Sequence, residues 1–158
     1  MSKITPFLWF DDRLEEAVNF YVSVFKDGKI LNISRMPGAD AKHPGKAFSA
    51  EFELQGQRFM ALNGGPEFTF TEAISFFVKC ENQSEVDYYW NALTADGGEE
   101  SQCAWLKDKY GLSWQIVPNA LVRYLGDPDP AKAQRVMQAM LKMQKIDIAE
   151  LDRAAAAA

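Results

Sequence analysis

The sequence predicts a small α+β protein built from two copies of one strand–helix–strand unit. Aromatic and β-branched segments alternate with segments whose apolar residues recur at helical spacing. The same order of elements also occurs twice along the chain. With 158 residues, 47% of them hydrophobic and 25% charged, the chain has the composition of a globular protein. This length suits one compact domain or two half-domains that share a core.

The first copy begins with a predicted strand over 3–10, where aromatic residues are frequent. A turn at Asp11–Asp12 leads into a predicted helix over 13–26, which Asp27–Gly28 ends. Gln55–Gly56 predicts a tight hairpin turn, and 37–45 an exposed loop. Three further strands are expected, at 29–36, 46–54 and 57–63.

The second copy begins with a predicted strand over 74–80. Ser84 then caps a helix expected over 84–96, which ends before Gly97–Gly98. Two strands follow, at 102–107 and 112–117, separated by the turn sequence DKYG.

The tail differs from both copies, because it contains no strand pattern. Asp127–Pro130 predicts a linker and a helix start, followed by helices at 131–145 and 147–154. The alanine run Ala154–Ala158 has high helix propensity, and we expect it to have nothing to pack against.

The duplication rests on one constant offset. Val18–Tyr21 and Val86–Tyr89 are similar segments that lie 68 residues apart (86 − 18 = 68). The same offset pairs Phe25 with Leu93, and Leu8–Phe10 with Phe76–Val78. Elements in the same order at one offset indicate a repeat. The alternative is two unrelated amphipathic helices.

Charge and cysteine content exclude several classes of protein. The net charge of −5 and the absence of a basic stripe argue against a nucleic-acid partner. No apolar run is long enough to span a bilayer, and no signal peptide is recognisable. The two cysteines form no CxxC pair, so we expect neither a disulfide framework nor a cysteine metal site. These observations predict a cytoplasmic protein with reduced thiols.

Several strings resemble the PhnB-like family, also labelled 3-demethylubiquinone-9 3-methyltransferase-like, of the vicinal oxygen chelate superfamily (glyoxalase, bleomycin resistance and dioxygenase proteins). The strings are PFLWFDD, EEAVNFY, FMALNGGPEFTF, EAISFFV, EVDYYW, WLKDKYGLSWQIVP and RVMQAMLKMQKIDI. The resemblance covers nearly the whole chain. It implies two βαβββ modules, about 1–67 and 68–118, which form one domain (1–118) around a cleft and precede a helical tail (119–158). It also implies a homodimer. The methyltransferase label is not supported by any strand followed by a glycine-rich loop that opens a helix.

The resemblance also implies where a metal would bind, because enzymes of the superfamily hold one divalent ion with His, Glu or Gln from four strands. The corresponding positions here are Thr5, Pro6 or Phe7; Ala61 or Asn63; Ile74 or Ser75; and Gln115. Only Gln115 is a residue type that the family uses. We therefore expect no cofactor and no tightly bound transition metal, while a loosely held divalent cation stays open.

Strand alternation suggests which side chains line the cleft. Ile74, Phe76 and Val78 are expected to pack on the second helix. The cleft would then take a small organic ligand between aromatic and amide side chains. Its expected residues are Phe7, Trp9, Phe59, Asn63, Ser75, Phe77, Trp105 and Gln115. The alternative is that the aromatic residues fill the core.

Four residues are candidates for catalysis. Glu51 and Glu53 share one face of a predicted strand, either as cleft carboxylates or as a solvent-facing edge. Cys103 is either a nucleophile near Lys107 and Lys109 or an inert thiol. His43, the single histidine, is either a solvated loop residue or a functional one, as part of a lid or as a proton donor.

The sequence is consistent with two functions. The first, which we favour, is a metal-free protein that binds a small molecule. The second is an enzyme of glyoxalase type, a lyase, isomerase or dioxygenase-like protein.

Overall fold

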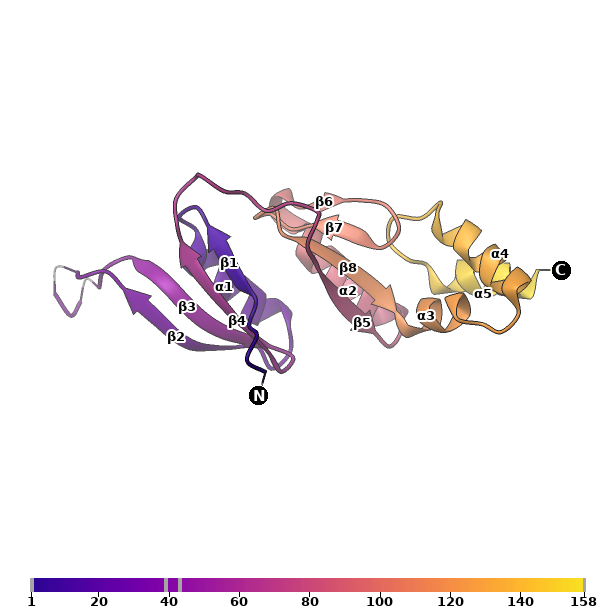
Figure 1. Cartoon of the computed structure of the whole chain (residues 1–158), viewed down its shortest axis with the longest axis horizontal. Coiled ribbons are helices and arrows are strands. Elements are labelled where there is room, and N and C mark those ends of the chain that lie inside the picture. Colours follow the sequence, from indigo (N-terminus) through magenta and orange to yellow (C-terminus); the bar gives the residue numbers. More distant parts are fainter. Residues whose placement is uncertain (1, 39, 43, 158) are drawn as a thin grey trace. The chain divides into compact units, whose positions relative to one another are not determined.

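The computed structural model describes residues 2–38, 40–42 and 44–157. The chain divides into two compact units, Met1–Phe70 and Thr71–Ala158. Each unit holds a four-stranded sheet with a helix on one face (Figure 1). The predicted division into modules 1–67 and 68–118 and a tail 119–158 stays a prediction.

The first unit is a βαβββ module. Its β1 pairs with β4 in parallel, and β4, β3 and β2 pair antiparallel, giving the order β1-β4-β3-β2. Gln55 and Gly56 both have positive φ (50° and 80°) in the two-residue turn between β3 and β4, as the hairpin signal predicts. The elements are β1 (Phe7–Phe10), α1 (Leu14–Val24), β2 (Lys29–Arg35), β3 (Ala47–Leu54) and β4 (Gln57–Asn63).

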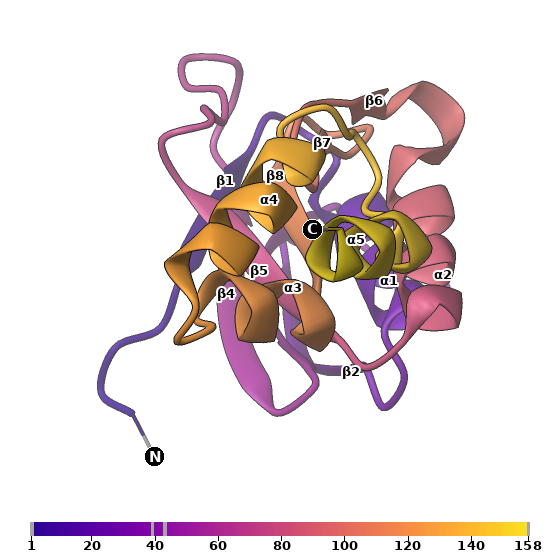
Figure 2. The same cartoon turned by 90° about the vertical axis from the view of Figure 1, so that its right-hand side faces the viewer.

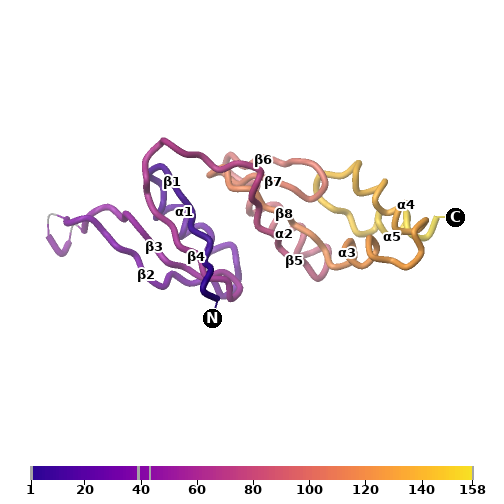
Figure 3. Tube along the Cα trace, in the orientation of Figure 1, coloured from indigo at the N-terminus to yellow at the C-terminus, as the bar shows by residue number. Residues whose placement is uncertain are grey.

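The second unit repeats this arrangement. Its sheet order is β5-β8-β7-β6, with β5 and β8 parallel and the other pairs antiparallel (Figure 3). β1 and β5 begin 68 residues apart (75 − 7 = 68). The predicted duplication of the fold is therefore confirmed. The elements are β5 (Ser75–Cys80), α2 (Gln83–Thr94), the 3-10 turn η1 (Ala95–Gly97), β6 (Glu99–Glu100), β7 (Trp105–Lys107) and β8 (Ser113–Pro118).

The two helices bury the same residue types against their sheets. Val18 and Tyr21 of α1 are buried, and so are Val86 and Tyr89, which stand 68 residues later in α2. Below α1, Phe52 is buried and stacks on Tyr21 with ring centroids 6.2 Å apart. Each helix thus supplies the apolar cover that its sheet needs on one face.

The strand predicted over 102–107 is shorter than expected. β7 begins at Trp105, because Cys103 and Ala104 both have positive φ (56° and 80°) and leave the extended conformation. The backbone N–H of Cys103 donates to the carbonyl of Met143, and that of Ala104 to the carbonyl of Gln144, each over 2.9 Å. These two residues therefore bind the tail and take no part in a strand.

Three helices form the tail, and Figure 2 shows α4 beside α5. The helix predicted over 131–145 is wrong at its C-terminal end, since α4 ends at Met140, and the short α3 was not predicted. Ala155 packs on the tail cluster, so the expectation that the alanine run has no packing partner is also wrong. The helices are α3 (Asn119–Leu125), α4 (Pro130–Met140) and α5 (Ile148–Ala156). The buried cluster consists of Ala104, Val117, Leu121, Val136, Ile146 and Leu151.

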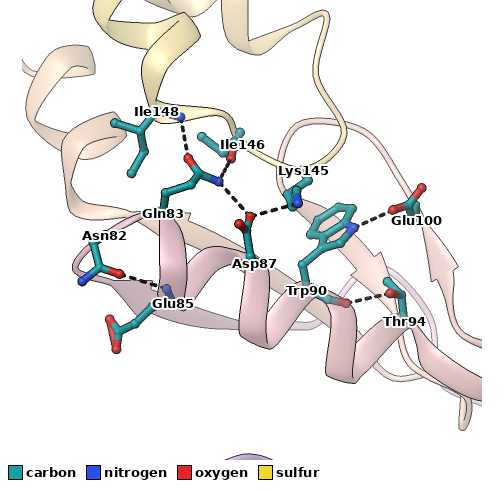
Figure 4. Close-up of polar contacts among 10 residues, drawn as sticks. All are labelled: Asn82, Gln83, Glu85, Asp87, Trp90, Thr94, Glu100, Lys145, Ile146 and Ile148. Atoms are coloured by element: carbon teal, nitrogen blue, oxygen red, sulfur yellow. Dashed lines mark hydrogen bonds and ion pairs between the residues drawn. The ribbon is translucent and has the colours of Figure 1, made fainter.

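One glutamine side chain attaches the tail to α2 (Figure 4). Gln83 donates through Nε2 to the carbonyl of Ile146 (2.9 Å) and accepts through Oε1 from the backbone N–H of Ile148 (2.8 Å). Lys145 adds an ion pair with Asp87 at 2.9 Å. The amide of Gln83 thereby satisfies one backbone carbonyl just before α5 and the first N–H of α5. Across the described residues, no helix combines the length and apolar character needed to cross a membrane.

Candidate functional site

The face of each sheet that its helix does not cover is called here the open face. In the second sheet, Gln115 of β8 stands between Phe77 of β5 and Trp105 of β7, since it is the cross-strand partner of both. Phe77 is 48% exposed, whereas Trp114, the next residue on β8, is buried on the helix side. Phe77, Trp105 and Gln115 are therefore neighbours on one open face, while their role in a ligand-binding cleft stays a prediction.

A side-chain hydrogen bond joins two of the predicted site residues. Gln115 donates through Nε2 to the hydroxyl oxygen of Ser75 over 2.9 Å, although the residues are 40 positions apart in sequence. Within the described part of the chain, the amide oxygen of Gln115 accepts no hydrogen bond and the hydroxyl of Ser75 donates none. One acceptor and one donor therefore remain for another molecule.

The open face of the first sheet is apolar at the equivalent positions. Phe7 pairs with Met60, and Trp9 with Leu62. Since the offset of 68 matches Trp9 with Phe77, Leu62 occupies the place that Gln115 has in the second sheet. The first sheet thus repeats the geometry of the second without its hydrogen-bonding pair.

Trp9 is held firmly on this face. Its indole N–H donates to the carbonyl of Gly65 over 2.9 Å, and its ring meets Phe68 edge-on with centroids 5.0 Å apart. A Cβ atom at Gly64 would lie 2.3 Å from the indole ring, so only glycine fits there. The glycine pair therefore positions an aromatic side chain and does not form a phosphate-binding loop.

Two residues placed in the cleft from the sequence lie elsewhere, and both placements are wrong. Phe59 is 4% exposed and stacks on Phe52 in the core, with ring centroids 5.2 Å apart. Asn63 accepts from the backbone N–H of Leu14 and donates to the carbonyl of Ala47, each over 2.9 Å. The reason is strand parity, because Phe59 and Asn63 alternate with the open-face residue Leu62 and so turn toward α1.

The carboxylate candidates lie on the open face of the first sheet. Glu53 pairs with Lys29 at 3.3 Å, and Glu51 approaches Arg58 at 3.9 Å. Both carboxylates are half-buried and each faces a cation across a neighbouring strand. Their shared face is confirmed, while a catalytic role for either stays a prediction.

The thiol candidate Cys103 is not part of either open face. Cys103 is half-buried and lies outside β7, so its predicted position on a strand is wrong. Lys107, expected near that thiol, instead forms an ion pair with Glu72. His43 lies outside the described residues.

The donor set does not fit a transition metal. The expected positions Ala61 and Asn63 lie on the helix side of the first sheet, and the equivalent of Gln115 there is Leu62. In place of imidazole and carboxylate groups, the open faces thus hold Phe7 and Leu62 in the first sheet and the hydrogen-bonded Ser75 and Gln115 in the second. A hydroxyl and a neutral amide bring no negative charge to the ion. In the part of the chain that the structure describes, no group of three His, Cys, Asp or Glu side chains is placed to bind a metal. The absence of a tightly bound metal nevertheless stays a prediction.

Asp108 is a structural residue that the sequence reasoning missed. It is 2% exposed, and its carboxylate accepts from the backbone N–H groups of Tyr110 and Leu112 and from the indole of Trp114. These bonds of 2.9–3.1 Å fix the turn from β7 to β8, which carries Gln115. The string DKYG signals the turn but not the burial of its aspartate.

Comparison with known proteins agrees with this geometry. The model of the family described as 3-demethylubiquinone-9 3-methyltransferase matches residues 2–117. The structure of a PhnB protein from Bacillus cereus, described under the same methyltransferase name, is 38% identical, with a TM-score of 0.65 over 74% of this chain and 99% of that one. A search of curated proteins found no match.

Two more distant structures share the fold. The protein PA1353 from Pseudomonas aeruginosa is 19% identical, with a TM-score of 0.61 over 75% of this chain and 98% of that one. The fosfomycin resistance protein FosX from Listeria monocytogenes, solved with Mn(II) and sulfate, is 15% identical, with a TM-score of 0.54 over 80% of this chain and 97% of that one. The chain therefore belongs to the family described as 3-demethylubiquinone-9 3-methyltransferase, the PhnB-like branch of the vicinal oxygen chelate superfamily.

Proposed function

We propose that this protein binds a small planar organic molecule with a carbonyl or hydroxyl group on the open face of its second sheet. The observation that carries the proposal is the hydrogen bond between Gln115 and Ser75, flanked by Phe77 and Trp105. The free amide oxygen accepts from a ligand hydroxyl or amide, and the serine hydroxyl donates to a ligand carbonyl. The aromatic rings on either side suit a flat molecule.

The binding function is preferred to the enzymatic alternative because of the contacts around the catalytic candidates. Glu53 forms an ion pair with Lys29 and Glu51 one with Arg58, so both carboxylates already have partners on the first sheet. Cys103 is engaged through its backbone with the tail. None of the three touches the Ser75–Gln115 pair through a described hydrogen bond or ion pair.

Methyl transfer is not proposed, although it appears in the family description. The short turns from β1 into α1 and from β5 into α2, at 11–13 and 81–82, contain no glycine. A nucleotide-like methyl donor bound in a glycine-rich turn between strand and helix would require one there.

The proposal includes a homodimer in the cytoplasm. Phe7 and Phe68 of the first unit are 51% and 62% exposed, and burial of such aromatic side chains favours association. The two free thiols, Cys80 and Cys103, suit a reducing compartment. Light scattering at micromolar concentration should give twice the mass of the chain; the mass of one chain would contradict the dimer.

Benzamide is a suitable probe for the site, because it combines a flat ring with one carbonyl and one amide. Calorimetry should show that Gln115→Ala weakens benzamide binding about fivefold, the value of one net hydrogen bond. Gln138→Ala, the same change at an exposed position of α4, should leave binding unchanged. Equal affinities for wild type and Gln115→Ala would contradict the proposal.

The same preparation tests the metal prediction. Protein purified without chelator should carry no stoichiometric zinc, nickel, iron or manganese after dialysis, because the proposed site offers only neutral donors. A stoichiometric metal that survives dialysis and is lost in Gln115→Ala would contradict this part of the proposal.

A further inference from the structure

A second feature of interest is a cavity of about 170 Å³ within the second unit. It lies beside the proposed site and shares Trp105 with it, but it contains neither Ser75 nor Gln115. Its volume corresponds to that of about six water molecules at ~30 Å³ each, enough for the end of a small organic molecule. The cavity is lined by Glu72, Glu99, Glu100, Ser101, Trp105, Leu106, Lys107 and Ser113.

Ser113 supplies the first observation that points to a ligand. The residue is 1% exposed, and its hydroxyl has no hydrogen-bond partner among the described residues. Its backbone neighbours are Ser75 on β5 and Lys107 on β7. Buried hydroxyl groups are nearly always hydrogen-bonded in proteins, so a lone one in the wall of a cavity calls for a partner from outside.

The charge around the cavity decides which kind of partner fits. Three carboxylates, Glu72, Glu99 and Glu100, stand against the single ammonium of Lys107. Glu72 forms an ion pair with Lys107, and Glu100 accepts from the indole of Trp90 at 2.6 Å (Figure 4). The net charge of the lining is therefore negative, which attracts a cation and repels an anion.

Two further groups suit a cation. The hydrogen bond that Lys107 donates to Glu72 is the main cause that raises the pKa of this lysine, and the nearby carboxylate of Glu99 adds a smaller effect. Glu99 forms no ion pair of its own among the described contacts. Trp105 adds an aromatic wall, and tryptophan is the aromatic residue that attracts ammonium groups most strongly.

We infer that this cavity binds the ammonium group of a small primary amine. The ammonium donates one hydrogen bond to the hydroxyl oxygen of Ser113 and another to the carboxylate of Glu99, and its alkyl chain lies against Trp105. The site is distinct from the Ser75–Gln115 pair and takes a different chemical group, so its test is separate from the benzamide test.

The test is an NMR titration of the full chain with butylammonium chloride, compared with sodium butyrate at the same ionic strength. Butylammonium should bind saturably, with a Kd on the order of millimolar for so few atoms. The backbone signal of Ser113 and the indole signal of Trp105 should shift. Butyrate that binds as tightly as butylammonium, or the absence of saturable binding by butylammonium, would overturn the inference.

Three variants locate the site. Glu99→Gln should weaken butylammonium binding about tenfold, since a charge-assisted hydrogen bond is lost. Glu81→Gln removes the same charge outside the cavity and should have no effect. Ser113→Ala should weaken binding about fivefold. It should not lower the thermal midpoint, because the hydroxyl has no partner in the free protein. A lower thermal midpoint for Ser113→Ala, or equal weakening by Glu99→Gln and Glu81→Gln, would overturn the inference.

Discussion

The two units share one topology and differ in the side chains on the open faces of their sheets. On the helix sides, Val18 and Tyr21 correspond to Val86 and Tyr89, and all four are buried. On the open faces, Leu62 stands where the second sheet has Gln115, and Phe7 where it has Ser75. The comparison teaches that the packing requirement is the same in both units, while the open face is free to vary and carries the difference in chemistry.

The hairpins before β4 and β8 differ in the same way. The first unit turns within two residues, Gln55 and Gly56, whose positive φ angles close the hairpin by backbone conformation alone. The second unit uses a longer turn, which the buried carboxylate of Asp108 holds together. The turn of the first unit thus depends on backbone conformation, whereas the turn of the second unit depends on hydrogen bonds to a side chain.

The largest effect should come from removing the Asp108 carboxylate that holds the turn of the second unit. Asp108→Ala leaves two backbone N–H groups and the Trp114 indole without their acceptor, which should lower the free energy of unfolding by about 3 kcal/mol. Urea denaturation followed by tryptophan fluorescence measures this. Asp12→Ala, which removes only an exposed ion pair with Lys46, should cost less than about 1 kcal/mol. Equal losses for the two variants would show that Asp108 does not hold the turn.

A smaller effect on stability is expected from removing the side-chain amide of Asn63 in the first unit. Asn63→Ala removes the acceptor for the first N–H of α1 and the donor to Ala47, so it should lower the free energy of unfolding by about 2 kcal/mol. Gln115→Ala, in contrast, should leave stability nearly unchanged, because its one partner is another side chain on the open face. Asn19→Ala on the exposed side of α1 serves as the control. If Gln115→Ala destabilised the protein as much as Asn63→Ala, the distinction between a structural and a binding amide would be lost.

The smallest effect concerns the two thiols, which should differ in their rate of reaction with a thiol reagent. Burial, with a smaller contribution from the charge of Glu85, raises the pKa of Cys80 from 9.0 to about 12. A thiol reagent at neutral pH should therefore label Cys103 first, and Cys80 only on opening of the structure.

The raised pKa of Cys80 also makes the stability of the folded protein depend on pH, with a definite sign. Since the pKa of Cys80 is higher in the folded protein, its contribution to stability is complete below pH 9 and decreases as the pH rises toward 12. Denaturation at several alkaline pH values should show this decrease in the wild type and less of it in Cys80→Ala. Rapid labelling of both thiols at neutral pH would contradict the burial of Cys80.

The sequence predicted most of the fold because the helices and strands are strongly periodic. Alternation on one strand also fits the positions of Phe77 and Trp9 on the open faces. It was wrong for Ile74, which was expected to pack on the second helix and is 70% exposed. Phe59 and Asn63 were misplaced because a shift of one residue reverses the face of every side chain, and the sequence does not give the register. The start of β7 was missed because Cys103 and Ala104 adopt positive φ without a glycine to signal it.

Features that depend on contacts between distant residues could not be predicted at all. The hydrogen bond between Ser75 and Gln115 joins two parallel strands, and the hydrogen bond from Gln83 to the carbonyl of Ile146 spans 63 positions. The burial of Ser113 likewise depends on side chains that meet only in the folded unit. Local pattern fixes neither the partners nor the distances of such groups.

The central claim is that the open face of the second sheet, which carries the Ser75–Gln115 pair, binds the ligand, and that the open face of the first sheet does not. NMR mapping of benzamide on the isotope-labelled chain tests this most directly. The account predicts saturable shifts at Ser75, Phe77, Trp105 and Gln115, and none centred on β1 and β4. Shifts centred on Phe7 and Leu62, with Gln115 unaffected, would contradict it.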